Sequence, residues 1–109
     1  MTALHKAARN GQVRISELLV GAGAAVDATD QFGRTALYFA ASRGQQGVVE
    51  VLLRNGANPN LLSHDGFSPL HAACMEMCNA DCVQALVEAG ANVHAETKDV
   101  WTPLHFAAR

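Results

Sequence analysis

The chain has 109 residues, of which half are apolar and 17% are charged, with a formal net charge of −2. This composition excludes an intrinsically disordered tail, because such tails carry too little apolar surface to offset the entropy lost on ordering. Eight scattered basic residues against ten acidic ones argue against nucleic acid as a partner, since phosphate binding depends on clustered Lys and Arg. The most continuously apolar stretch, residues 18–26, is far shorter than the roughly 20 residues of a membrane-spanning helix, so we expect no membrane partner.

Three cysteines, an odd number, lie close together at Cys74, Cys78 and Cys82. A small secreted fold would spread paired cysteines over the whole chain, so free thiols are expected. The N-terminus also lacks the basic segment and apolar run of a secretory signal. We therefore expect a reducing compartment, either the cytoplasm or the nucleus.

The sequence repeats itself. Four segments resemble one another, with starts such as Thr-Ala-Leu-His and Thr-Pro-Leu-His. They lie at residues 2–8, 35–41, 68–74 and 102–108, and their first residues are 33, 33 and 34 residues apart. A Gly-Ala motif recurs in phase with them, at residues 23–27, 56–60 and 90–94. Two motifs that keep the same phase over several periods indicate a repeat architecture. We predict one domain over residues 1–109, made of repeats 2–34, 35–67 and 68–101 and a partial repeat 102–109.

Each unit begins with the signals of a short helix. A hydroxyl residue opens each segment and is suited to cap the helix, because it can accept a bond from a free backbone N–H; these residues are Thr2, Thr35, Ser68 and Thr102. Pro69 and Pro103 follow at the first helical position, where a missing N–H costs nothing. Gly11 and Gly44 are placed to end this helix, since glycine accepts the left-handed conformation.

A second helix is predicted in each unit from apolar residues at i, i+3 and i+4, namely Ile15, Leu18 and Leu19, then Val48, Val51 and Leu52, then Cys82, Ala85 and Leu86. Gly23, Gly56 and Gly90 end these helices. The residues that follow contain Asp, Asn and Gly, which is typical of a β-hairpin or an extended loop that leads to the next helix. With 20 alanines and only six aromatic residues, the core is predicted to consist of closely approaching helices.

Together these features resemble the ankyrin repeat family over residues 2–109. The resemblance rests on the Thr-Pro-Leu-His type of start, the paired Ala after it, the Gly-Ala-x-Val/Pro-Asn/Asp stretch and the period of 33. It implies an all-α fold, a solenoid of helix-turn-helix units joined by β-hairpin loops. It also implies a non-catalytic module without cofactor or metal, which binds a partner protein or peptide, as in scaffold and adaptor proteins.

The repeats depart from this pattern at a few positions. Tyr38 replaces the motif histidine in the second repeat, and its phenol can still donate a hydrogen bond. The third repeat has one extra residue, so we expect Asn79 to take a left-handed turn and Asp81 to cap the second helix. Val100 stands where the other hairpins have glycine, and a β-branched residue resists positive φ. A locally distorted third hairpin is therefore predicted.

The two ends of the array differ in polarity. In the first repeat, Lys6 and Ser16 replace residues that are apolar elsewhere, which suits a terminal repeat with a solvent-facing side. The fourth repeat contains one helix, so we expect an open apolar flank near Phe106 and a chain that is part of a longer array. Self-association through this C-terminal end is therefore the alternative function.

Partner binding is assigned by resemblance, because ankyrin repeats bind proteins through hairpin tips and the inner face of the first helices. The matching tip residues are Gln31, Phe32, Arg34, His64, Asp65, Phe67, Lys98, Asp99 and Trp101, and the helix residues are Arg9, Asn10, Ser42, Arg43, Met75, Glu76 and Arg109. Phe32, Phe67 and Trp101 are the expected anchors, since exposed aromatic residues are enriched at binding hot spots. The alternative is that these rings pack against the adjacent hairpin, and that the charged tip residues are simply solvated.

Two further features have a structural alternative. His71, Cys74, Cys78 and Cys82 carry zinc-ligand chemistry, but the repeat alignment matches Cys74 and Cys82 to core residues, so we expect no metal and only Cys78 to be reachable. Asn60, with Leu52 eight residues before it, matches a position at which some ankyrin repeats are β-hydroxylated. A structural asparagine that bridges the turn is the favoured interpretation of Asn60.

Overall fold

The computed structural model describes residues 1–75 and 80–92. These residues form helices in pairs, two to each of the first three repeats, and contain no strand. The helices are α1 (Ala3–Arg9), α2 (Val13–Gly21), α3 (Ala36–Ser42), α4 (Gln46–Arg54), α5 (Pro69–Met75) and α6 (Ala80–Glu88). The predicted all-α class is thus confirmed, as is the predicted pair of helices in each of the first three repeats, whereas the partial repeat 102–109 lies outside the described residues.

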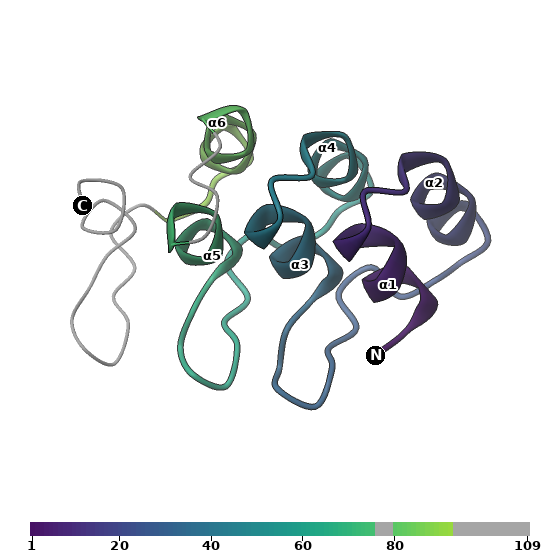
Figure 1. Cartoon of the computed structure of the whole chain (residues 1–109), viewed down its shortest axis with the longest axis horizontal. Coiled ribbons are helices and arrows are strands. Elements are labelled where there is room, and N and C mark those ends of the chain that lie inside the picture. The colour runs from purple at the N-terminus through teal and green to yellow at the C-terminus, as the bar shows by residue number, and fades with distance from the viewer. Residues whose placement is uncertain (76–79, 93–109) are drawn as a thin grey trace.

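The pairs stack side by side in two rows (Figure 1). One row contains α1, α3 and α5, and the other contains α2, α4 and α6, with contacts between neighbours along and across the rows. The loops that lead into α3 and α5 extend away from the second row and lie next to each other. Each repeat therefore meets only its neighbours, as expected for a solenoid.

The first helices begin where the hydroxyl residues predict. Thr2 Oγ1 accepts the N–H of His5 at 3.2 Å, and the ring of His5 reaches back to the Thr2 backbone in a capping box. Thr35 Oγ1 and Ser68 Oγ accept the equivalent N–H groups at the start of α3 and α5, also at 3.2 Å. One hydroxyl thus satisfies an otherwise free backbone donor in each of the three repeats.

The helix ends also follow the prediction. Gly11 has a φ of 70° directly after the last turn of α1. A left-handed residue at this point lets the chain turn sharply into the next helix, and glycine adopts it without steric cost. Gly44 and the predicted terminators of the second helices take the same conformation.

The core is thin because small side chains fill it. The alanine pairs of the first helices are almost completely buried, and one leucine from each helix of the second and third repeats fills the space between the rows; these residues are Leu37, Leu52, Leu70 and Leu86. Replacing one of them by alanine is expected to lower the free energy of unfolding by about 2–5 kcal/mol.

Some expectations were wrong in detail. Ser16 is fully buried instead of facing solvent, while Ile15 and Leu18 on the same helix are exposed. Lys6 is exposed, as predicted. Helix α6 begins at Ala80, so Asp81 lies within its first turn and is not its cap. Tyr38 is half-buried and meets Phe39 edge to face, with 6.0 Å between the ring centroids. Asn79, Val100 and Phe106 lie outside the described residues.

Candidate partner-binding surface

The first hairpin tip, residues 30–34, is organised by the carboxylate of Asp30. Its Oδ1 accepts the backbone N–H groups of Phe32 and Arg34, each at 2.9 Å. Its Oδ2 accepts the Nε–H of Arg34 at 2.9 Å and forms an ion pair with the same guanidinium. The Asp30 N–H donates to the Arg34 carbonyl at 3.0 Å, which closes the turn. The tip therefore has a fixed shape without a regular strand.

This environment keeps Asp30 ionised. Burial of the carboxyl, whose side chain is only 4% exposed, acts to raise its pKa. The hydrogen bonds from the backbone and side chain of Arg34 and from the Phe32 N–H, together with the Arg34 charge, outweigh burial and hold the pKa of Asp30 below its ordinary value.

Arg34 lies between two aromatic rings. Its guanidinium carbon is 4.9 Å from the ring centroid of Phe32 and 4.8 Å from that of Phe39 in α3. Both distances are within the range of cation–π attraction. Phe39 is buried, whereas Phe32 remains 51% exposed. The tip is thus attached to the first row of helices and presents an aromatic ring to solvent beside a cation.

The two described tips are joined to each other. The backbone N–H of His64 donates to the carbonyl of Phe32 at 2.9 Å. The His64 ring covers Gly33, where an added Cβ would lie 2.5 Å from His64 Cδ2. Gly33 also has a φ of 77°. Glycine is therefore required here both by the backbone conformation and by the close approach of the second tip.

The second tip, residues 63–67, is closed by Ser63 instead of an aspartate. Its N–H donates to the Phe67 carbonyl at 2.8 Å, and its Oγ accepts the Phe67 N–H at 3.2 Å. Phe67 occupies the repeat position of Arg34. Its half-buried ring meets His71 edge to face, with 6.0 Å between centroids. Phe67 therefore packs partly against its own repeat and presents less surface than Phe32.

The other predicted binding residues differ in where they lie and how exposed they are. Phe32, Arg34 and His64 are brought together at the joined tips. Gln31 and Asp65 are exposed on the tips, and Arg43 is exposed at the C-terminal end of α3, away from the tips. Ser42 and Met75 are half-buried on the first row of helices. Glu76, Lys98, Asp99, Trp101 and Arg109 lie outside the described residues.

Two residues of this surface were not predicted from the sequence. Asp30 fixes the shape of the first tip through its hydrogen bonds, and the ring of Phe39 packs against the Arg34 guanidinium. Asp30 carries a recognisable signal, because an aspartate at the start of a tight turn commonly accepts backbone N–H groups two or more residues later. Phe39 carries none, since its contact with Arg34 depends on how the loop folds back on α3.

Asn60 bridges the second and third repeats. Its Oδ1 accepts the Asn92 N–H at 2.8 Å, and its Nδ2 donates to the Gly90 carbonyl at 3.1 Å. Asp27, one repeat earlier, accepts the Asn58 N–H in the same manner at 3.0 Å. Asn60 thus has a structural role, as favoured, but its side chain joins two neighbouring repeats, where a bridge across its own turn was expected. With Asp27 it forms a series of side-chain bonds along the loops.

The cysteines of the candidate zinc cluster have core environments. Cys74 and Cys82 are buried and are not joined in a disulfide. Burial, with smaller effects of the Asp81 and Glu50 charges, raises the pKa of the Cys82 thiol and makes it a poor nucleophile. Cys78 lies outside the described residues. Within residues 1–75 and 80–92, no three His, Cys, Asp or Glu side chains are grouped closely enough to hold a metal ion.

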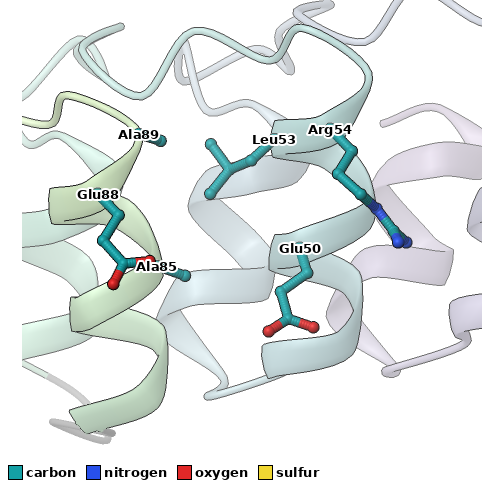
Figure 2. Close-up of a pocket in the computed structure, with 6 residues that line it drawn as sticks. All are labelled: Glu50, Leu53, Arg54, Ala85, Glu88 and Ala89. Carbon is teal, nitrogen blue, oxygen red and sulfur yellow. The ribbon is translucent and has the colours of Figure 1, made fainter.

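A shallow pocket of about 390 Å³ lies in the other row, between α4 and α6. Figure 2 shows Leu53 pointing from α4 towards α6, while Arg54 points away from the pocket. Glu50 and Glu88 lie at its sides, and Ala85 and Ala89 present only methyl groups. The pocket therefore combines two carboxylates with an apolar floor.

Helix pairs stacked in two rows, with hairpin tips bonded along one side, define a helical repeat solenoid, a class that binds macromolecules over an extended surface. The model of ankyrin repeats, three copies, matches residues 1–63 and 52–109. The chain belongs to the ankyrin repeat family, whose domains are generally non-catalytic and mediate protein–protein interaction.

Relatives with similar sequences come from different kinds of protein. The chain is 33% identical over 88 residues to an ankyrin repeat protein of Fowlpox virus, covering 80% of this chain and 26% of that protein. It is 40% identical over 70 residues to the Neurogenic locus Notch protein of Drosophila melanogaster, covering 63% of this chain and 3% of that protein. It is 40% identical over 74 residues to Inversin of Homo sapiens, covering 67% of this chain and 7% of that protein. The chain thus spans about a quarter or less of the length of these relatives.

Among the helices of the described ranges, none is long and apolar enough to cross a membrane.

Proposed function

We propose that the chain binds a partner protein or peptide across its joined hairpin tips and the exposed ends of its first helices. The observation that carries the proposal is the exposed ring of Phe32, held beside the Arg34 guanidinium by the Asp30 carboxylate. Aromatic and arginine side chains dominate binding hot spots, because each removes a large area from water with little loss of freedom. Here both side chains are ordered before any partner arrives.

The chemistry of the tips indicates the kind of partner. Phe32 offers an apolar contact and Arg34 a cation on the first tip, Asp65 offers an anion on the second tip, and Arg43 offers a cation at the C-terminal end of α3. Such a mixed surface suits a polypeptide segment with an apolar residue and a carboxylate. It suits nucleic acid poorly, since phosphate binding needs clustered cations. A role as one module of a scaffold or adaptor protein agrees with this surface.

Affinity purification from cell extract with quantitative mass spectrometry tests the proposal. Phe32→Ala is expected to reduce capture of the specific partner by at least about ten-fold, as for a hot-spot residue. Arg34→Ala is expected to reduce it as well. Val87→Ala is the matched control, because Val87 is also a large exposed apolar residue, 44% exposed, but lies on α6 in the other row.

Equal loss of the partner with Phe32→Ala and Val87→Ala would contradict binding at the tips. Retention of the partner by Phe32→Ala and Arg34→Ala, with unchanged circular dichroism, would contradict it equally.

Three further proposals accompany this function. Self-association through the C-terminal end is tested by light scattering over a concentration series. Residence in the cytoplasm or nucleus agrees with two buried cysteines that are not in a disulfide and is tested by imaging of the tagged chain. β-Hydroxylation of Asn60 would leave both of its side-chain bonds in place, and mass spectrometry would detect the added oxygen.

A further inference from the structure

The pocket between α4 and α6 lies in the row of second helices, whereas the hairpin tips extend from the far side of the other row (Figure 1). Its floor is apolar, because Leu53 reaches from α4 towards α6, where Ala85 and Ala89 present methyl groups (Figure 2). The volume of about 390 Å³ leaves room for a side chain that enters from solvent. The pocket is therefore a surface feature separate from the tips.

The preceding contact of the same row, between α2 and α4, has larger side chains at the equivalent positions. Val51 of α4 occupies the repeat position of Ala85 and is buried. Arg54 of α4 occupies the repeat position of Glu88. At the contact between α4 and α6, a methyl group thus stands in place of a valine, and a carboxylate in place of a guanidinium. The shorter side chain explains the open space, and the carboxylate changes its charge.

Two carboxylates, Glu50 of α4 and Glu88 of α6, lie on either side of the apolar floor (Figure 2). Each accepts one hydrogen bond from a glutamine of its own helix. Gln46 Nε2 donates to Glu50 Oε1 at 3.4 Å, and Gln84 Nε2 donates to Glu88 Oε1 at 3.0 Å. Within residues 1–75 and 80–92, neither carboxylate forms an ion pair. Both carboxylates can therefore accept further bonds from a cation.

The negative charge acts across the pocket. After burial and the Asp81 charge, the charge of Glu50 is the third cause that raises the pKa of the Cys82 thiol, which lies on the opposite helix. Arg54 also borders the pocket, but its guanidinium points away from it (Figure 2). The pocket therefore attracts a cation from solvent.

The combination of charge and apolar floor selects the kind of cation. A guanidinium is planar and has five N–H donors, so it can bond two carboxylates at once, and its methylene stem covers apolar surface. The ammonium of lysine is compact and more strongly hydrated. A metal ion would leave the floor of Leu53, Ala85 and Ala89 in contact with water. An arginine side chain satisfies both parts of the pocket.

We propose that the pocket between α4 and α6 is a docking site for an arginine side chain of a partner polypeptide. The argument rests on charge complementarity over an apolar groove. The arginine stem lies over Leu53, Ala85 and Ala89. Its guanidinium donates to the carboxylates of Glu50 and Glu88. The site is in the opposite row of helices from Phe32, so it and the tips can be occupied together, and each can be tested without the other.

The experiment titrates the full chain with a short peptide, acetyl-Ala-Arg-Ala-amide, and follows the methyl NMR signals of Leu53, Ala85 and Ala89. We expect these signals to shift with a saturable dependence on peptide concentration. The same peptide with citrulline in place of arginine keeps the shape and loses the charge. It is expected to bind at least about five-fold more weakly, as for the loss of two exposed charge contacts. Equal binding of the two peptides would overturn the proposal.

Variants locate the bound arginine. Glu88→Gln is expected to raise the Kd of the arginine peptide by about two- to five-fold. Ala85→Val fills the space as Val51 does one repeat earlier, and it should abolish saturable binding. Glu17→Gln is the matched control, because Glu17 is exposed at the repeat position of Glu50 but lies on α2; it should leave the Kd unchanged. A Kd that Glu88→Gln does not raise, or that Glu17→Gln raises equally, would overturn the proposal.

Discussion

The Nε2 of His5 in the first repeat donates to the carbonyl of Arg34 in the second, with 2.9 Å between the atoms. The direction of this bond follows from the other side of the ring. The Thr2 backbone N–H, which can only donate, lies 3.1 Å from Nδ1, so Nδ1 accepts and Nε2 carries the proton. One buried imidazole thus caps its own helix and holds the neighbouring hairpin.

Replacing His5 is therefore expected to weaken the array at two points. His5→Ala should lower the free energy of unfolding by about 1–3 kcal/mol, because it leaves the Thr2 cap and the Arg34 carbonyl with fewer partners. Urea denaturation followed by circular dichroism measures the change. Lys6→Ala, at an exposed neighbouring position, is the control and should change little; similar losses in both variants would contradict a specific role of the ring.

Asp30 is expected to make stability depend on acid pH. Its pKa is below the ordinary value of 3.8 in the folded chain, so its contribution is present above the unfolded pKa and is lost as pH falls through the folded one. Asp30→Asn should be less stable than wild type at pH 7, and the gap should narrow below pH 3.8. Denaturation midpoints measured from pH 7 downward test this, and a gap independent of pH would exclude an electrostatic role.

Alanine substitutions at two glycines separate the effect of the contact between the tips from the effect of a positive φ. Gly33→Ala and Gly56→Ala both place a side chain at positive φ, 77° and 88°. Only the first would also collide with His64, since nothing lies within 4 Å of a Cβ at Gly56. Gly33→Ala should therefore cost more, by about 1 kcal/mol or above for displaced packing. Adding His64→Ala should reduce the excess by removing the ring, although the backbone N of residue 64, 3.0 Å from the added Cβ, remains. An excess that is undiminished would contradict a collision with the His64 ring.

Ser16 offers a stabilising substitution. Its hydroxyl is buried and has no hydrogen-bond partner among the described residues. Ser16→Ala removes this unsatisfied group and should raise the free energy of unfolding by about 1 kcal/mol. Ser63→Ala is the comparison, because the Ser63 hydroxyl accepts the Phe67 N–H, and it should lower stability. Thermal unfolding of both variants tests this expectation. Destabilisation by Ser16→Ala would show that the Ser16 hydroxyl makes a stabilising hydrogen bond.

The sequence predicted features that depend on local chemistry. The hydroxyl caps at Thr2 and Thr35 and the turn at Gly11 follow from which backbone conformations and donors each residue can satisfy. These signals lie within a few residues of the structure they determine. The fold class could therefore be obtained without any knowledge of the packing.

The missed features depend on direction and on distant partners. The spacing of Ile15 and Leu18 places them on one apolar face, but periodicity does not tell which side of the repeat a neighbour covers. A polar residue in a terminal repeat is expected to face solvent, but the position of Ser16 on α2 turns its side chain inward. Phe67 occupies the repeat position of Arg34, not that of Phe32. The aromatic residues Phe32 and Phe67 of the two tips therefore do not lie in one row along the array.

The bond from His64 to the Phe32 carbonyl has a consequence for thermodynamics. A loop that orders only when it meets its ligand loses backbone and side-chain freedom at that moment, and this loss reduces affinity. Here the two tips lose that freedom when the protein folds. A ligand that meets them is therefore selected mainly by the contacts it makes, and calorimetry should find a small entropic penalty from the protein.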